Sequence, residues 1–278
     1  MTNQLQMQAN DKTRKMRLLE GAVLYGPFAI ALVFFACCVV IELLQIDISM
    51  ERRDLFYSVF GSVSYYSSIL LNVVYGRKYG LGWVRSLIFS LASFFLLFSY
   101  TSQAWTWLDE QMFGVAALAS FRSAMFLPLL CLILSRFCKV DTLNLCDYLT
   151  PYFFFHHGVV TVPCWISGCC AGSTCSWGLR NPLSGLTVFP TQPCIILLSV
   201  GVALWGLLYS KKHDYKANGK VFAYSLCVYG IGRYVIELFS DDARVWWVLS
   251  WLAICSLAMI VEGFVVRFIA SKRYQTLS

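Results

Sequence analysis

Eight long apolar runs, separated by short polar stretches, follow one another along the chain. They lie at residues 19–44, 54–75, 83–102, 113–135, 148–168, 190–210, 221–239 and 246–266. A helix needs roughly 20 apolar residues to cross about 30 Å of hydrocarbon, and each run is close to that length. Backbone groups cannot stay unpaired in lipid, so runs of this length are expected to cross as helices. The pattern predicts an all-α integral membrane protein, a polytopic helical bundle of seven to eight transmembrane spans.

The polar stretches between the runs are too short to form a separate soluble domain. We therefore expect one transmembrane domain at residues 19–270, with an extracytoplasmic Gly/Cys-rich loop at about 163–193. Residues 1–18 are polar, and no small-residue cleavage site follows the first run. That run is expected to be an anchor and not a cleaved signal peptide.

Lysine and arginine gather in alternate connections between the runs. One set holds Lys12, Arg14, Lys15, Arg17, Arg77, Lys78, Arg85, Arg136, Lys139, Lys211, Lys212, Lys216, Lys220, Arg267, Lys272 and Arg273, and the opposite set holds only Arg52, Arg53, Arg180 and Arg244. Cytoplasmic loops of membrane proteins carry the excess of basic residues. Both termini are therefore expected in the cytoplasm, with residues 1–18 as a cytoplasmic segment.

Composition agrees with a membrane solvent. Of the 278 residues, 58% are hydrophobic and only 13% are charged, and the mean hydropathy is +0.64. A soluble domain of this size carries far more surface charge. The net charge of +7 is accounted for by membrane orientation, so we infer no nucleic-acid partner.

The stretch CVYGIGRYVIELFSDD places two opposite charges inside an apolar run. Arg233 and Glu237 are four residues apart, so they share one helix face, and Tyr229 lies one turn earlier. Ionisable groups at bilayer depth mark functional sites by default. A guanidinium oriented by a carboxylate can hold a phosphate with two parallel hydrogen bonds. The alternative is a structural ion pair that joins neighbouring helices.

Two further features accompany this pair. Gly230 and Gly232 remove side-chain bulk beside Arg233, so a ligand or another backbone could approach there. Arg122, in ALASFRSAMFLPLL, has no acidic residue within one turn. Its partner is expected from another helix, from a ligand, or from water at an interfacial position.

The loop PCWISGCCAGSTCSWGLRNPLSGLTVFPTQP contains Cys164, Cys169, Cys170 and Cys175. A zinc site that includes His156 or His157 would need cysteine pairs at the usual close spacing, which this loop lacks. No metal and no cofactor are therefore predicted. A disulfide on an oxidising face and free thiols that act as small hydrophobic groups both remain open.

The order of these motifs resembles one family. YGIGRYVIE resembles the Tyr-Gly-x-x-Arg-x-x-x-Glu signature near the C-terminus of bacterial prolipoprotein diacylglyceryl transferases. Further landmarks, in the family's order, are Tyr25-Gly26, DYLTP at 147–151, SGCCAG at 167–172, Trp177-Gly178 and Pro190-Thr191-Gln192. The resemblance covers most of the chain from about residue 20 onward.

The resemblance implies a reaction at the outer leaflet of the bacterial cytoplasmic (inner) membrane. A diacylglyceryl group passes from phosphatidylglycerol to the lipobox cysteine thiol of a preprolipoprotein, in lipoprotein biosynthesis. The implied partners are phosphatidylglycerol, the preprolipoprotein signal peptide and membrane lipids. The implied protein is a multi-pass transferase whose active site faces the extracytoplasmic side.

The resemblance also implies roles for individual residues. Arg233 would hold the lipid phosphate, and Glu237 would orient Arg233. Tyr229 and Tyr25 would line the head-group pocket. The glycines of the loop, Gly168 and Gly172, would let its backbone pack closely at the pocket mouth, and Arg122 is an unaligned cation that could substitute on the phosphate.

Several positions depart from the family's pattern. Thr161 and Cys164 stand where the family has an arginine and an asparagine, Cys169 replaces a glutamate, Phe113 or a neighbour replaces a histidine, and Ser240 replaces an arginine. A second interpretation is therefore a catalytically degenerate member that binds a lipid or a partner. A small transporter is a third interpretation, supported only by Arg122.

Overall fold

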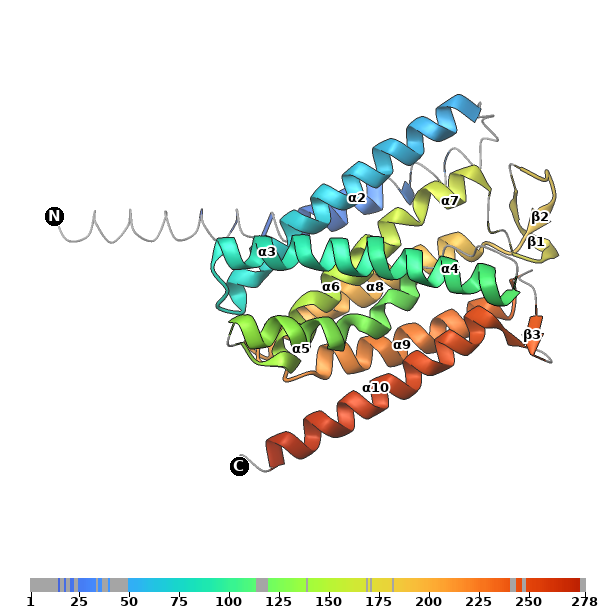
Figure 1. The fold of residues 1–278 in the computed structure, drawn as a ribbon. Coiled ribbons are helices and arrows are strands. Elements are labelled where there is room, and N and C mark those ends of the chain that lie inside the picture. Colours follow the sequence, from blue (N-terminus) through green and yellow to red (C-terminus); the bar gives the residue numbers. More distant parts are fainter. Residues whose placement is uncertain are drawn as a thin grey trace.

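The computed structural model describes most of the chain from residue 50 onward. The described residues are 50–113, 120–138, 140–168, 170, 172–181, 183–240, 244–246 and 249–275, with Lys15, Leu18, 21–22, 25–33, 35–36 and Val40 before them. Helices dominate the described chain (Figure 1). They are α2 (Met50–Lys78), α3 (Trp83–Ser93), the π-helix η1 (Phe94–Tyr100), α4 (Thr101–Phe113), the 3-10 helix η2 (Ser120–Phe126), α5 (Leu127–Cys138), α6 (Thr142–Val160), α7 (Val162–Ser167), α8 (Thr191–Lys212), α9 (Lys220–Glu237) and α10 (Trp251–Gln275).

The prediction of a mostly helical fold is confirmed. Within the described residues, two helices are long and apolar enough to cross a membrane, Thr191–Lys212 and Trp251–Arg273. The total of seven to eight spans remains a prediction. The first apolar run, 19–44, is described only in part, and 25–33 within it are helical.

The third and fourth predicted runs have different boundaries in the structure. The third predicted run covers 83–102, but α3, η1 and α4 continue into one another from Trp83 to Phe113. The fourth was placed from residue 113, whereas its described helix begins at Ser120 as η2 and continues as α5. Apolar periodicity does not mark these boundaries, because polar residues such as Asp109 are buried inside the longer helix.

Two small antiparallel hairpins were not predicted. They pair β1 (Thr174–Arg180) with β2 (Thr187–Val188), and β3 (Arg244–Trp246) with β4 (Leu249–Ser250). The first hairpin turns on Asn181, whose side-chain oxygen accepts hydrogen bonds from the backbone N–H groups of Leu183 and Ser184. Such local side-chain bonds favour a turn over a helix.

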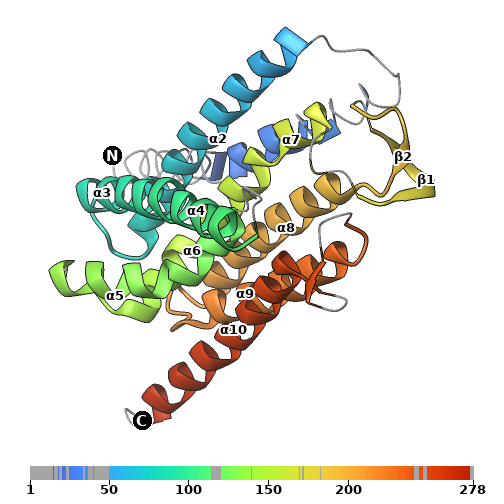
Figure 2. The ribbon, with the colours of Figure 1, turned by 45° about the vertical axis from the view of Figure 1, so that its right-hand side comes forward.

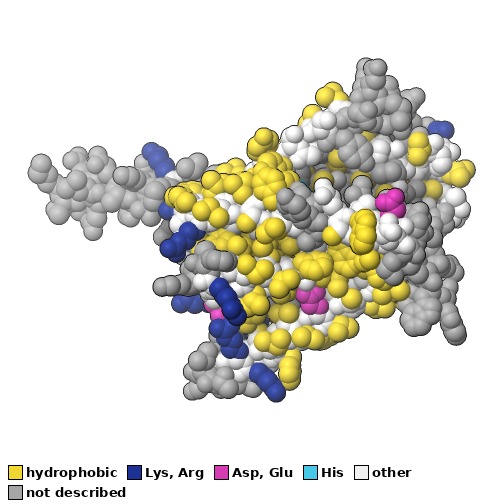
Figure 3. Space-filling view, in the orientation of Figure 1, with side chains coloured by type: hydrophobic (Ala, Val, Ile, Leu, Met, Phe, Trp, Pro, Cys, Tyr) yellow, Lys and Arg dark blue, Asp and Glu magenta, His cyan; other side chains and the backbone are white. Residues whose placement is uncertain are grey.

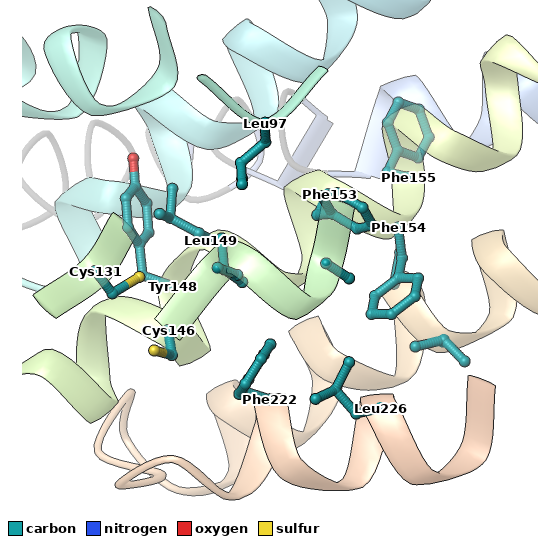
Figure 4. Packing of buried hydrophobic residues seen from close by; sticks show 14 of the residues in the cluster. Leu97, Cys131, Cys146, Tyr148, Leu149, Phe153, Phe154, Phe155, Phe222 and Leu226 are labelled. Carbon is teal, nitrogen blue, oxygen red and sulfur yellow. The ribbon is translucent and has the colours of Figure 1, made fainter. Parts of the chain in front are cut away.

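The helix α6 lies at the centre of the packing. All but three of its residues are buried, and it packs against α2, α5, α8 and α9. Phe222 and Leu226 of α9 point toward α6, whose aromatic residues include Phe153 and Phe154 (Figure 4). A helix that is apolar all round is expected inside a bundle. From α6 the packing continues through α8 to α9 and then to α10 (Figure 2).

Basic side chains gather at one end of the molecule. Figure 3 shows them beside a broad hydrophobic face, at the end where α2, α8 and α10 finish. The last turns of these helices contain Arg77, Lys78, Lys211, Lys212, Lys272 and Arg273. The β1–β2 hairpin lies at the opposite end of α8. The two ends of the bundle therefore differ in charge and in backbone structure.

Candidate functional site

Arg233 and Glu237 form a buried ion pair near the C-terminal end of α9. Their exposed fractions are 7% and 6%. Glu237 also accepts a hydrogen bond from the Ser250 hydroxyl at 2.7 Å. Ser250 in turn accepts a bond from the backbone N–H of Ala253 in the first turn of α10, at 3.1 Å. The carboxylate is therefore held by α9 and by the last residue of β4, directly before α10, and it fixes the direction of the guanidinium.

The ring of Phe121 connects this pair to its neighbours. The Arg233 guanidinium carbon lies 5.3 Å from the ring centroid, within the range of a cation–π contact. The Tyr229 ring lies 6.0 Å away and the His157 ring 6.2 Å away. Phe121 belongs to η2, so this short helix reaches the site formed by α6 and α9.

Tyr229 and His157 are joined by a hydrogen bond. The Tyr229 hydroxyl lies 2.8 Å from Nε2 of His157, and both side chains are buried. Sequence reasoning considered His157 only as a possible zinc ligand. The sequence could have indicated a role for His157, because it lies in a run expected to cross hydrocarbon, where a polar side chain needs a partner. The spacing of 72 residues gave no indication that the partner is Tyr229.

Arg122 has a different partner. Its two terminal nitrogens bond the two carboxylate oxygens of Asp109, at 2.7 and 2.6 Å, and both residues are buried. The guanidinium also lies 4.9 Å from the ring of Trp105. The partner of Arg122 thus comes from another helix, α4, which was one of the three sources considered. A substrate-binding role for Arg122 remains a prediction.

The Gly-rich loop touches the chain directly after α9. The Ser173 N–H donates to the Phe239 carbonyl at 2.8 Å, and Gly172 pairs with Ser240. A Cβ atom at Gly172 would lie 2.6 Å from the Phe189 carbonyl oxygen and 2.9 Å from that of Phe239. Only glycine fits this approach without a backbone shift. The loop is therefore packed within two residues of Glu237.

Gly168 occupies a second special position in the same loop. It ends α7 with φ of 72°, a left-handed conformation that favours glycine. The side-chain amide of Asn181 donates to its carbonyl at 2.8 Å, so the hairpin turn is tied to the end of α7.

The remaining predicted residues lie against other parts of the bundle. A Cβ atom at Gly230 would lie 2.8 Å from the Ser256 carbonyl and 2.7 Å from Ile260, so another backbone, that of α10, approaches this glycine. Tyr25 is half-buried and packs against the main core. Substrate contacts by these two residues remain predictions.

Of the four loop cysteines, Cys164, Cys170 and Cys175 lie within the described residues, while Cys169 lies outside them. Cys175 is a free thiol. The disulfide and the packed thiols remain alternative predictions for this loop. Within the described part of the chain, no group of three metal-ligating side chains is found.

Comparison with known proteins identifies the family of this chain. A family model described as prolipoprotein diacylglyceryl transferase matches residues 114–269, which is more than half of the chain. The chain belongs to the prolipoprotein diacylglyceryl transferase family. The family is membrane-embedded, which agrees with the two apolar helices, and the matched range contains His157, Gly172, Tyr229, Arg233 and Glu237.

Two curated relatives are similar to this transferase-family chain. Phosphatidylglycerol–prolipoprotein diacylglyceryl transferase 2 of Clostridium perfringens is 29% identical over 113 residues, covering 38% of this chain and 43% of the relative. The phosphatidylglycerol–prolipoprotein diacylglyceryl transferase of Clostridium tetani is 27% identical over 118 residues, covering 39% and 47%. The match therefore spans less than half the length of each relative.

Proposed function

We propose that this protein transfers a diacylglyceryl group from phosphatidylglycerol to the lipobox cysteine thiol of a preprolipoprotein. The observation that carries the proposal is the buried Arg233, whose guanidinium is oriented by Glu237 while Ser250 holds that carboxylate. An oriented guanidinium in a low-dielectric site favours a phosphate ester, and it stabilises the negative charge that grows on a departing phosphate.

The reaction needs a nucleophile, a leaving group and a proton acceptor. The lipobox sulfur attacks the glycerol carbon that bears the phosphate, so a C–S bond forms and the C–O bond breaks. Glycerol phosphate leaves with the bonding electrons on its oxygen, where Arg233 binds it. The thiol must lose its proton for the attack. The hydrogen-bonded Tyr229–His157 pair is the proposed acceptor of this proton, which would pass through the Tyr229 hydroxyl to Nε2 of His157.

The family's arginine, asparagine and glutamate around the Gly-rich loop are replaced here, so Arg233 carries a larger share of phosphate binding in this proposal. The chain is proposed to be a multi-pass protein of the bacterial cytoplasmic membrane. Its basic end would face the cytoplasm and the β1–β2 hairpin would face outward, as the asymmetry of Lys and Arg favours.

The test uses the purified full chain in liposomes that contain phosphatidylglycerol with a labelled diacylglyceryl group, and a lipobox peptide as the acceptor. Arg233→Lys keeps the charge but loses the planar fork, so transfer should fall sharply. Arg233→Ala should abolish transfer while the protein still inserts. Glu237→Gln should be milder, because an amide oxygen still accepts one hydrogen bond from the guanidinium.

Thermal stability and binding of phosphatidylglycerol are measured on the same variants. A purely structural pair gives the opposite pattern, since either substitution leaves a buried charge without compensation and destabilises the bundle. Lost stability with unchanged lipid binding by the folded fraction would contradict the proposal. Lipid binding without any transfer by the wild-type chain would instead identify a catalytically degenerate member.

A further inference from the structure

A cationic groove lies between α9 and α10 at the basic end of the bundle. Its volume is about 250 Å³, and it is lined by Asn218, Lys220, Arg267, Ala270 and Ser271. Lys220 begins α9, whereas Arg233 lies thirteen residues later on the same helix. At 1.5 Å per residue the two positions are about 20 Å apart along the helix axis. The groove is therefore separate from the candidate site.

The two cations of the groove are not neutralised by carboxylates within the described residues. Arg267 donates from Nε to the Tyr224 hydroxyl at 3.2 Å and lies 5.9 Å from that ring, contacts that fix its orientation and leave its charge uncompensated. Two carboxylates, one in α6 and one at its N-cap, lie near the groove and are engaged in other contacts. Asp141 pairs with Arg273 at 2.7 Å, and Asp147 accepts backbone bonds from the start of α9. The groove therefore carries two positive charges that attract an anion.

Apolar side chains adjoin the groove on α10. Phe264, Arg267, Phe268 and Ser271 follow the i, i+3, i+4, i+7 spacing of one helix face. Phe264 is 65% exposed and Phe268 is 58% exposed. A ligand that fits this face combines an anionic group, for the groove, with a hydrocarbon part, for the two phenylalanines. An anionic lipid has both of these parts, whereas a free ion lacks the hydrocarbon part.

We propose that this groove binds the phosphate of an anionic diacyl phospholipid in the leaflet at the basic end of the bundle. Arg267 and Lys220 contact the phosphate oxygens, and the Asn218 side-chain amide offers an additional hydrogen bond. The acyl chains lie along the exposed phenylalanines of α10. A volume of 250 Å³ equals that of about eight water molecules, enough for a phosphate with part of its glycerol.

The experiment counts lipids bound to the purified full chain by native mass spectrometry. The probes are phosphatidylglycerol, phosphatidylcholine with the same acyl chains, and glycerol 1-phosphate without chains. The groove variant is the double substitution Lys220→Gln and Arg267→Gln. The matched control, Arg136→Gln and Lys211→Gln, removes two exposed cations from the basic end outside the groove.

The expected result is that the groove variant binds one phosphatidylglycerol about 30-fold more weakly, while the control variant retains it. In the Arg233→Ala background, which removes the lipid bound at the candidate site, the groove substitutions should weaken the remaining phosphatidylglycerol by the same factor, so the result does not depend on whether the protein is a transferase. Equal losses in the groove and control variants would overturn the proposal, because they indicate general electrostatic attraction. If glycerol 1-phosphate binds as tightly as phosphatidylglycerol, the proposal is overturned in favour of a site for free phosphate. If phosphatidylcholine binds as tightly as phosphatidylglycerol, the net charge of the lipid does not determine binding, and the proposal is also overturned.

Discussion

The hydroxyl of Tyr229 lies 2.8 Å from Nε2 of His157, although the two residues are 72 positions apart in the sequence. This hydrogen bond joins α6 to α9 one helical turn from Arg233. The Tyr229 hydroxyl and the His157 ring, which can exchange protons, therefore lie close to the Arg233–Glu237 pair.

Replacing His157 by phenylalanine tests whether this pair takes part in transfer. We expect a loss of transferase activity of about a hundredfold, the lower range for general acid–base catalysis, in the liposome assay. Tyr229→Phe should give a similar loss while keeping the ring contacts. The neighbour His156, which stacks on Tyr152, provides the matched control as His156→Phe. Equal losses from His156→Phe and His157→Phe would show that packing is responsible.

The Arg122–Asp109 pair should behave as a structural element. Asp109→Leu leaves a buried guanidinium without its carboxylate and should lower the free energy of unfolding by about 3–5 kcal/mol. Combining it with Arg122→Met should recover much of that loss. Thermal unfolding in detergent measures both, with the exposed neighbour Glu110→Leu as the control. A double variant as unstable as the single one would contradict this account.

Asp147 should be required for docking the start of α9. Its carboxylate accepts the backbone N–H groups of Gly219 at 2.7 Å and Phe222 at 2.9 Å. Asp147→Ala leaves both buried donors unsatisfied, so the free energy of unfolding should fall by about 1–3 kcal/mol for each. Asp147→Asn retains one acceptor oxygen and should cost less. Hydrogen exchange at residues 219–223 should increase in the same order. Unchanged hydrogen exchange at these residues would show that Asp147 does not hold the start of α9 in place.

Eight spans with both termini in the cytoplasm are expected from the distribution of Lys and Arg. Alkaline phosphatase is active only outside the cytoplasm, so fusions after residue 15 and at the C-terminus should be inactive. A fusion within the β1–β2 hairpin should be active. An active terminal fusion would contradict the orientation, and it would also move the proposed lipid groove to the outer leaflet.

The sequence predicts the local relationships well. The mostly helical fold follows from the length of the apolar runs, and the pairing of Arg233 with Glu237 follows from their spacing of four residues. Gly172 was expected to permit close backbone packing, and Phe189 and Phe239 lie close to it. Each of these features depends on residues near one another in the chain or on the small size of glycine.

The remaining contacts depend on how helices pack. Ser250 reaches Glu237 from β4, and Asp109 reaches Arg122 from α4; in each pair the two residues are thirteen positions apart in the sequence and lie on different elements. Apolar periodicity identifies which residues avoid water but not which helix lies opposite them. The hairpin at Asn181 lies within the predicted loop, and its turn depends on backbone bonds to the Asn181 side chain, which the apolar pattern does not indicate.

The bond between Asp147 and the start of α9 also constrains the order of biogenesis. When α6 leaves the ribosome, Gly219 and Phe222 are still 72 and 75 residues away from Asp147 in the chain and have not been synthesised. The carboxylate must then stay hydrated or be chaperoned, since lipid alone offers it no hydrogen-bond donor. The final seating of α6 in the bundle therefore follows the synthesis of α9, and nascent chains that stop before residue 219 retain an unsatisfied acid at their centre.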